Sequence, residues 1–295
     1  MNKWRSVLTI WGMMLSLLIV STPVMAQTNA TESVVRGVID AINAGDVDGA
    51  LALVAEDAVI TLFPPPPGTA GVFQGKEEIR GWWQGYVAGH GYTEFTAFHT
   101  FGNTAVWSAR VGDDAFTQLG VGELEFDGVG VVQGGLLKSY TWSMTEAAQA
   151  RLEAALARES NKAVLQRAYD QVFSEGKLEL LDEDIAPDAV DHSFPELTGV
   201  DAFRQPIAEL RAAFPDLQVT ADLMIAEGDF VMALVTFTGT HESEFLGIPP
   251  TGQQITWSHV DINRLENGKV VEAWHIGVPA AILQALGYQL VPPAE

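Results

Sequence analysis

Four of the six histidines in this 295-residue chain lie in its second half, and one of them stands two residues from a carboxylate. The segment ITWSHVDINRL contains this pair, His259 and Asp261. An imidazole held beside a carboxylate can move protons near neutral pH. We therefore expect His259 and Asp261 to form part of an acid/base site in a pocket. The alternative is that both lie on a polar outer face of a sheet.

The same segment predicts a β-strand, because Ile, Thr, Trp and Val are frequent in strands. Side chains alternate between the two faces of a strand, so one face is expected to carry Trp257, His259, Asp261 and Asn263. On this face, Trp257 is expected to contact a ligand beside the acid/base pair.

A hairpin is predicted directly after this strand, because Asn267-Gly268 separates it from the β-type run KVVEAWHIGV. Counting back from a two-residue turn puts Asp261 opposite Trp274 and Val260 opposite His275. Trp274 is therefore expected on the face of Asp261, as a ligand contact. His275 is expected on the other face, as a further acid/base residue or as a histidine satisfied among apolar neighbours. A slip of one residue would reverse these faces.

The loop before the strand, FLGIPPTG, is expected to be rigid, because its two prolines restrict the chain. Phe245, Leu246 and Ile248 are expected to line the wall of a ligand pocket or to pack on the core as the apolar side of an ordinary turn. His241 precedes this loop in the turn-like segment GTHESE. It is expected either at the surface or as a ligand contact.

Familiar cofactor and nucleophile motifs are absent from the sequence. There is no HExxH, no Walker loop, no GxGxxG after a strand and no GxSxG. The chain has no cysteine, and its histidines lack the short spacing of metal ligands. We expect no cofactor and no metal ion.

The composition restricts the partners of the protein. The formal net charge is −22, and 47% of the residues are hydrophobic. Nucleic acids and anionic membrane surfaces bind clustered Lys and Arg, so neither is an expected partner. A chain this hydrophobic can bury a core, so a disordered chain is not expected.

Residues 1–26 are typical of a secretory signal peptide. Lys3 and Arg5 precede the apolar run VLTIWGMMLSLLIV, and Val24 and Ala26 stand where a signal peptidase site needs small residues. The run is shorter than the roughly 20 residues of a spanning helix, which makes an uncleaved anchor the less favoured alternative. We expect an exported protein, periplasmic or secreted, with no stable membrane insertion after cleavage.

The chain repeats itself at nearly constant spacing, which predicts a duplicated domain. Landmarks in the first half recur 131 positions later: Gly45 at Gly176, Asp57-Ala58-Val59 at Asp188-Ala189-Val190, and Phe63-Pro64 at Phe194-Pro195. Trp142 and Trp274 stand 132 apart and are expected to be equivalent. We predict domains at 27–145 and 161–290, joined by a linker helix at 146–160. In each copy helices precede strands, which indicates an α+β fold.

The second copy resembles the SnoaL-like family, which includes polyketide ester cyclases of the nuclear-transport-factor-2-like superfamily. The stretches LRAAFPDLQVTADLMIAEGDFV, GTHESEFLGIPPTGQ and DINRLENGKVVEAW carry the resemblance over nearly all of residues 160–290. The first copy matches the superfamily only loosely. The resemblance implies two cone-shaped α+β barrels, each a curved antiparallel sheet wrapped on about three helices, with a pocket open at one end.

The resemblance also bears on the site residues. In such cyclases a histidine near the place of His192 lies at the pocket mouth, which implies that His192 is catalytic. These cyclases use an acidic residue a few positions after the late Trp as their acid/base. The matching place here holds Val278. Proton removal next to a carbonyl would then depend on His259, Asp261 or His275.

Two functions are therefore expected as alternatives. The first is an enzyme whose second domain binds a small apolar, carbonyl-bearing molecule and performs cofactor-free cyclisation, isomerisation or hydrolysis. The second is a non-catalytic module for a ligand or a protein partner that has lost the cyclase acid/base residue. The two copies could also pair through their sheets as an intramolecular pseudo-dimer, and a homo-oligomer is a further possibility.

Overall fold

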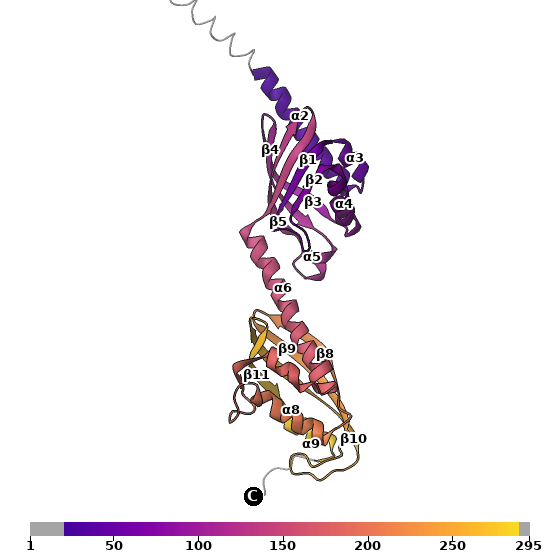
Figure 1. The fold of residues 1–295 in the computed structure, drawn as a ribbon, viewed down its shortest axis with the longest axis vertical. Helices are drawn as coiled ribbons and strands as arrows, with labels where there is room; N and C mark the ends of the chain where they lie inside the picture. The colour runs from indigo at the N-terminus through magenta and orange to yellow at the C-terminus, as the bar shows by residue number, and fades with distance from the viewer. Residues whose placement is uncertain (1–20, 289–295) are drawn as a thin grey trace, which may run out of the picture. The chain divides into compact units, whose positions relative to one another are not determined.

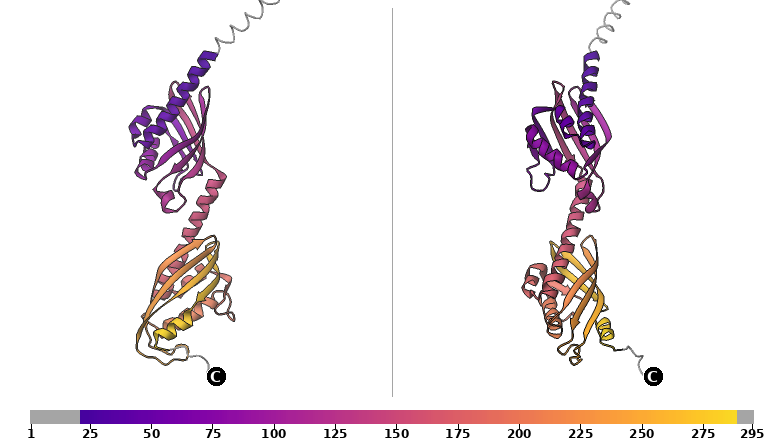
Figure 2. Two further views of the ribbon diagram at one scale, coloured as in Figure 1. Left: turned by 180° about the vertical axis from the view of Figure 1, so that it is seen from behind. Right: turned by 90° about the vertical axis from the view of Figure 1, so that its right-hand side faces the viewer.

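The computed structural model describes residues 21–288 and divides into two compact units, with the division between Glu153 and Ala154 (Figure 1). Each unit consists of one sheet with helices packed over one of its faces (Figure 2). The predicted α+β class and the two-domain organisation are confirmed. The division falls inside helix α6 (Glu146–Arg167), which contains the predicted linker and continues beyond it.

The first unit has four helices and a six-stranded sheet among the described residues. Its helices are α2 (Ser21–Asn43), α3 (Val47–Ala52), α4 (Gly75–Ala88) and α5 (Asp114–Gln118). Its strands are β1 (Val54–Phe63), β2 (Val72–Gln74), β3 (Tyr92–Phe101), β4 (Thr104–Gly112), β5 (Leu124–Gln133) and β6 (Leu136–Met144).

The second unit repeats this arrangement with a five-stranded sheet. Its helical segments are the end of α6, the π-helix η1 (Ala168–Ser174), the 3-10 helix η2 (Leu178–Leu180), α7 (Leu181–Asp184), α8 (Asp201–Ala213) and α9 (Val278–Ala285). Its strands are β7 (Ile185–Asp191), β8 (Gln218–Glu227), β9 (Phe230–Thr240), β10 (Gln254–Glu266) and β11 (Lys269–Ile276).

Both sheets are mixed, which corrects the expectation of purely antiparallel sheets. The strand orders are β2-β1-β6-β5-β4-β3 and β7-β11-β10-β9-β8. In each unit the last four strands form an antiparallel meander. The first long strand, β1 or β7, instead lies parallel to the last one, β6 or β11. Between that first strand and its parallel partner the chain passes through α4 or α8 and then three strands of the meander, which gives the long connection that parallel pairing requires.

Glycine ends the first helical segment of each unit, as the repeat predicts. Gly45 follows α2 with φ of 78°, and Gly176 follows η1 with φ of 80°. These are left-handed conformations that a residue with a side chain adopts only with strain. The matched glycines therefore stop the matched helices and turn the chain toward the sheet.

The hairpin between β10 and β11 forms at the predicted Asn267-Gly268 turn, where both residues have positive φ. A β-bulge follows, because Leu265 pairs with Val270 but Arg264 pairs with Glu272. One residue of β11 is therefore unpaired. The first unit has a bulge at the matching step of its β5–β6 hairpin, where Val132 pairs with Leu137 and Val131 with Ser139.

Each unit has its own hydrophobic core between sheet and helices. Val38, Ile60 and Trp107 belong to the core of the first unit, and Phe214 and Phe237 to that of the second. Among the described residues, no helix is long and apolar enough to cross a membrane. The predicted signal peptide falls mostly on residues 1–20, outside the described part of the chain.

Candidate functional site

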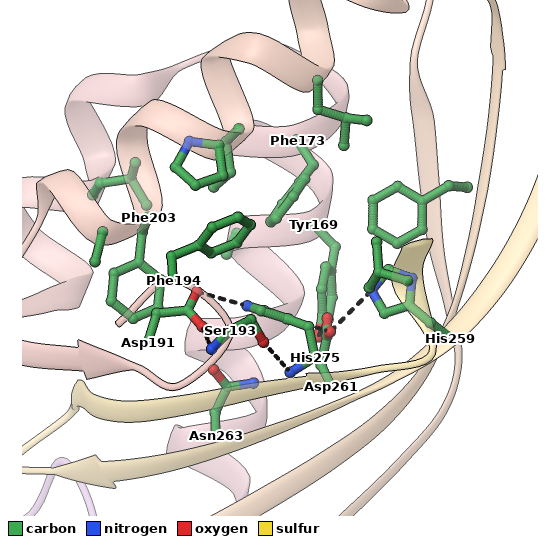
Figure 3. Close-up of a pocket in the computed structure, with 18 of the residues that line it drawn as sticks. Tyr169, Phe173, Asp191, Ser193, Phe194, Phe203, His259, Asp261, Asn263 and His275 are labelled. Carbon is green, nitrogen blue, oxygen red and sulfur yellow. Dashed lines mark hydrogen bonds and ion pairs between the residues drawn. The ribbon is translucent and has the colours of Figure 1, made fainter. Parts of the chain in front are cut away.

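The second unit contains a cavity of about 270 Å³ between its sheet and its helices (Figure 3). Its walls are mainly hydrophobic, and α6, η1, α8, β10 and the loop after β9 contribute to them. Aromatic side chains supply much of this surface: Tyr169, Phe173, Phe194, Phe203, Phe237, Phe245 and Trp257. A few polar groups interrupt the apolar wall, as expected of a site for a small ligand.

Strand β10 supplies the central polar groups through its alternation. Trp257, His259, Asp261 and Asn263 are buried and line the cavity, while the residues between them point to the other face. The predicted inward face of this strand is thus the one that meets the cavity.

The bulge changes which residue of β11 faces Asp261. Asp261 pairs with His275, and Trp274 pairs with Ile262. The predicted register was therefore wrong by one residue, because the unpaired residue of β11 was not anticipated. The consequence is that His275 joins the face of His259 and Asp261, and Trp274 lies on the opposite face.

Asp261 accepts three hydrogen bonds at the base of the cavity (Figure 3). His275 Nδ1 lies 2.6 Å and His259 Nε2 lies 3.0 Å from its Oδ1 atom. The hydroxyl of Tyr169 donates to Oδ2 at 2.9 Å. Burial raises the pKa of this carboxyl, but the bonds from His259 and His275 outweigh burial and hold the pKa far below its usual range. Asp261 is therefore a fixed anion.

His275 bridges two carboxylates (Figure 3). Its Nδ1 faces Asp261, and its Nε2 lies 3.0 Å from Asp191 Oδ2. Burial lowers the pKa of His275, but the hydrogen bonds and charges of Asp191 and Asp261 raise it to about 10. An ionised carboxylate only accepts hydrogen bonds, so both ring nitrogens donate. His275 is an imidazolium whose two N–H groups are occupied by the protein.

His259 is the histidine of this cluster with a free ring nitrogen. Its Nε2 donates to the fixed anion Asp261, which leaves Nδ1 as the acceptor when the ring is neutral. Nδ1 is buried and has no hydrogen-bond partner among the described residues. The ring stacks on Phe237 with centroids 4.7 Å apart. An imidazole oriented by a carboxylate through one nitrogen can act as a base through the other.

Two predicted site residues lie away from the cavity wall. The rings of His192 and Trp274 stack at 4.5 Å with an interplanar angle of 6°. His192 Nε2 is 3.8 Å from Glu272, and Phe230 packs against the same tryptophan. Neither His192 nor Trp274 lines the cavity. The structure thus places this pair with outward-facing residues of the sheet.

The FLGIPPTG loop divides its apolar residues between two environments. Phe245 and Leu246 line the cavity, whereas Ile248 is buried in the core. A tight turn explains the division, because Phe245 and Ile248 bond to each other across Leu246 and Gly247, both with positive φ. The loop therefore closes one part of the cavity and anchors itself in the core.

His241 is fully buried, contrary to a position at the surface. Its ring stacks on Phe214 with centroids 5.3 Å apart, and its Nδ1 lies 3.2 Å from the Thr251 hydroxyl. It does not line the cavity. Its contacts hold the loop after β9 against the core.

Tyr169 and Asp191 complete the cluster and were not predicted as site residues. Tyr169 lies in η1, far from β10 in sequence, and Asp191 is the last residue of β7. Asp191 also accepts a bond from the backbone N–H of Ser193 at 2.8 Å. The repeat held a signal for both, because their matches 131 positions earlier are the apolar residues Val38 and Ile60. A polar residue replacing a core residue in a duplicated fold marks a site.

Three side chains of the cluster, those of His259, Asp261 and His275, also have the spacing of a metal site. Ligand atoms of His259, Asp261 and His275 lie within 4.8 Å of one another. Protons already join these atoms as hydrogen bonds, and a metal ion would have to displace one from His275, whose pKa is about 10. The arrangement therefore favours proton chemistry over metal binding near neutral pH.

In the first unit, the matching positions carry no such cluster. Counted from the two hairpin turns, positions 133 apart are equivalent, so Phe126, Gly128 and Trp142 correspond to His259, Asp261 and His275. This corrects the expected equivalence of Trp142 with Trp274. The Trp107 ring packs directly over Gly128 and lies 5.4 Å from that of Trp142. Aromatic rings fill the space that the second unit leaves open.

The mixed sheets with helices over one face define two domains of the nuclear-transport-factor-2-like class, and the second domain contains the cavity. Family models agree with this class over most of the chain. The model described as SnoaL-like polyketide cyclase matches residues 163–286, and the model described as SnoaL-like domain matches residues 35–133.

Named relatives are similar to part of the chain. The nogalonic acid methyl ester cyclase of Streptomyces nogalater is 30% identical over 102 residues, which are 33% of this chain and 76% of the relative. The aklanonic acid methyl ester cyclase DauD of Streptomyces sp. strain C5 is 28% identical over 36% of this chain and 69% of its own. IdmH of Streptomyces antibioticus, a solved structure, is 30% identical over 43% of this chain and 99% of its own, with a TM-score of 0.39. The chain belongs to the SnoaL-like family, with two such domains in tandem.

Proposed function

We propose that the second domain binds a small, mainly apolar molecule that carries a carbonyl group, and that it catalyses cofactor-free acid/base chemistry on it. The observation that carries this proposal is His259, which lines an apolar cavity with one nitrogen held by Asp261 and the other unpartnered. The relatives named as methyl ester cyclases support a carbonyl compound as the substrate class.

His259 would take the place of the acidic residue that the family resemblance implies after the late Trp. Val278 stands there and lines the cavity with an apolar side chain. His259 approaches the same cavity from β10, and its Nδ1 lone pair can remove a proton from a carbon next to a carbonyl. The imidazolium formed by this step would lie 3.0 Å from the anion of Asp261, which stabilises it.

The other members of the cluster would position this base. Asp261 fixes the orientation of the His259 ring, and Tyr169 and His275 fix Asp261. His275 itself is unsuited to the role of base, because both its nitrogens already carry protons bound to carboxylates. Asp261 is equally unsuited, because its pKa is far below the range of a general base at neutral pH.

Non-catalytic binding is the second candidate, and one observation favours it. The implied acidic residue is absent, and Val278 adds to an apolar wall that suits retention of a ligand. Mass spectrometry of small molecules released from the denatured protein, purified from its native host, would reveal a retained ligand. A stoichiometric compound that is never turned over would support this second function.

Deuterium exchange into 2-tetralone tests the catalytic proposal. This bicyclic ketone is apolar and has acidic hydrogens next to its carbonyl, so NMR in D₂O reports their removal. We expect wild type to accelerate exchange above the buffer rate, and His259→Gln and Asp261→Asn to lower the acceleration by about 10²- to 10⁴-fold. His99→Gln, on an exposed position of β3, is the matched control. Binding of the ketone without exchange in wild type would replace catalysis by the binding function.

We also propose that the protein is exported, on the pattern of residues 1–26. Edman sequencing or intact mass of the protein from its native host tests this proposal. A mature chain that begins at Gln27 is the expected result, and an intact Met1 terminus would contradict it.

A further inference from the structure

Two residues on the inward face of β10, two positions apart, each have an unpartnered nitrogen. Trp257 Nε1 and His259 Nδ1 are both buried without a hydrogen-bond partner among the described residues. An indole nitrogen only donates, and the Nδ1 of His259 accepts, because Nε2 holds the proton shared with Asp261. Both residues line the cavity, so the ring of one carries an unused donor and the ring of the other an unused acceptor.

Packing holds both rings on the same neighbour. Phe237 stacks on Trp257 with centroids 5.3 Å apart and on His259 with centroids 4.7 Å apart. The two residues are two positions apart on one strand, so their Cα atoms are separated by roughly 6.5 to 7 Å. Trp257 and His259 thus line neighbouring parts of the same cavity.

Burial makes these two unpartnered groups costly. An unpaired buried polar group costs about 1–3 kcal/mol, and most such groups in proteins have a partner. Asp261 and His275 have all their expected partners within the protein. A bound molecule that supplies an acceptor to Trp257 and a proton to His259 would recover the cost at both positions.

We propose that Trp257 is a catalytic residue whose indole N–H binds the carbonyl oxygen of the substrate. This inference rests on the proposed function and narrows the substrate to an enolisable ketone or ester. Its carbonyl oxygen accepts from Trp257, and the adjacent C–H faces His259 Nδ1. When the C–H bond breaks, its proton moves to Nδ1 and its electron pair moves through the new C=C bond onto the carbonyl oxygen. Return of the proton to carbon or oxygen completes a redox-neutral step.

The chemistry explains why an indole fits this position. Negative charge develops on the oxygen during enolisation, and a buried, preorganised N–H stabilises that charge more than water does. The indole is neutral, so it adds no second charge to a site that already holds the fixed anion Asp261. A substrate without a carbonyl gains nothing from this donor.

Trp257→Phe tests the role of the N–H, because phenylalanine keeps an aromatic ring beside Phe237 and removes the donor. We expect deuterium exchange into 2-tetralone to slow by about 10- to 100-fold, mainly in kcat. The matched control is Trp107→Phe in the first domain, which removes another buried indole N–H without a partner, far from the His–Asp cluster in sequence and in a different unit. The control should keep the wild-type exchange rate.

A spectroscopic readout separates this inference from the proposed function. Carbonyl-¹³C 2-tetralone bound to wild type should resonate downfield of the same ketone in cyclohexane, since a hydrogen bond polarises the carbonyl. Trp257→Phe should bring the resonance back toward the cyclohexane value. If this variant fails to fold, the carbonyl resonance of 2-tetralone bound to wild type still tests the inference. A bound resonance equal to that of the ketone in cyclohexane would overturn it.

The outcomes are distinct. Wild type that shows no exchange contradicts the proposed catalysis. If wild type and Trp257→Phe have the same rate of exchange and the same carbonyl resonance, the proposed catalysis remains supported and Trp257 has no role in it. Loss of exchange in Trp107→Phe as well would assign the effect to general destabilisation and also reject the inference.

Discussion

The two units of this chain share the order of five strands, to which the first unit adds β2 at one edge, and they have different interiors. Both form the same meander with one parallel strand at its side, and both have a bulge at the same step of the last hairpin. Inside, the first unit is filled by aromatic rings, and the second has an open cavity with an ionised cluster. The fold alone therefore does not create the site.

Five matched positions account for the difference. The second unit has Tyr169, Asp191, His259, Asp261 and His275, where the first has Val38, Ile60, Phe126, Gly128 and Trp142. Each polar residue of the cluster corresponds to an apolar residue or glycine. A buried polar group needs a partner. Removal of one member of the cluster would leave another unpaired, so the polar residues are expected to occur together or to be absent together. The comparison teaches that function here depends on groups that satisfy one another.

Gly128→Asp should produce the largest effect, because it places one member of the cluster where the others are missing. Its Cβ would overlap the indole of Trp107, and its carboxylate would be buried with no histidine beside it. We expect the first unit to lose more than about 4 kcal/mol of its free energy of unfolding, measured by urea denaturation followed by tryptophan fluorescence. Gly81→Ala, in α4 with open space around it, is the control and should be neutral or stabilising. Normal stability of Gly128→Asp would show that the first interior can open.

The charged state of His275 should make the stability of the second unit depend on pH. Folding raises the pKa of His275 from about 6.5 to about 10, so protonation of this ring favours the folded state. The resulting stabilisation is fully present below pH 6.5 and is lost as the pH rises through 10. We expect wild type to lose about 4 kcal/mol relative to His275→Gln between pH 6.5 and 10. At the acid end the sign is opposite, because the lowered pKa of Asp261 gives stability that is lost as the pH falls below about 4. Urea denaturation at a series of pH values measures both. If the free energy of unfolding depends on pH in the same way in wild type and His275→Gln, His275 is not an imidazolium that bridges two carboxylates.

His192→Ala should have the smallest effect and decides the role of the outward-facing pair. Loss of the stack on Trp274 should destabilise the protein by about 0.5–1 kcal/mol in urea denaturation. The rate of deuterium exchange into 2-tetralone should stay within about twofold of wild type, because His192 does not line the cavity. A tenfold loss of exchange would return this histidine to the site.

Much of the fold could be predicted from the sequence because the signals are local or repeated. Gly45 and Gly176 mark helix ends, Asn267-Gly268 marks a hairpin, and the spacing between copies marks the two domains. Alternation along β10 was sufficient to put His259 and Asp261 on one face. These features depend on a few neighbouring residues and tolerate small errors of alignment.

The site was predicted less completely because it depends on long-range contacts and on one unpaired residue. No rule of composition reveals that β11 has an extra residue, and without it the face of His275 is reversed. Tyr169 and Asp191 reach Asp261 and His275 only through the tertiary fold. Both residues are polar at positions where the first copy has apolar residues. Only a comparison of the two copies reveals this signal.

The bulge in the last hairpin also records the history of the chain. The unpaired residues Lys138 and Val271 occupy the same step in both hairpins, although their side chains have nothing in common. Two independent insertions at one step are less economical than one insertion in a single ancestral domain that was later copied. The backbone irregularity is thus common to both copies, and it is compatible with an open interior as well as a filled one. In the second copy this geometry turns His275 inward, and in the first copy the same geometry buries a tryptophan.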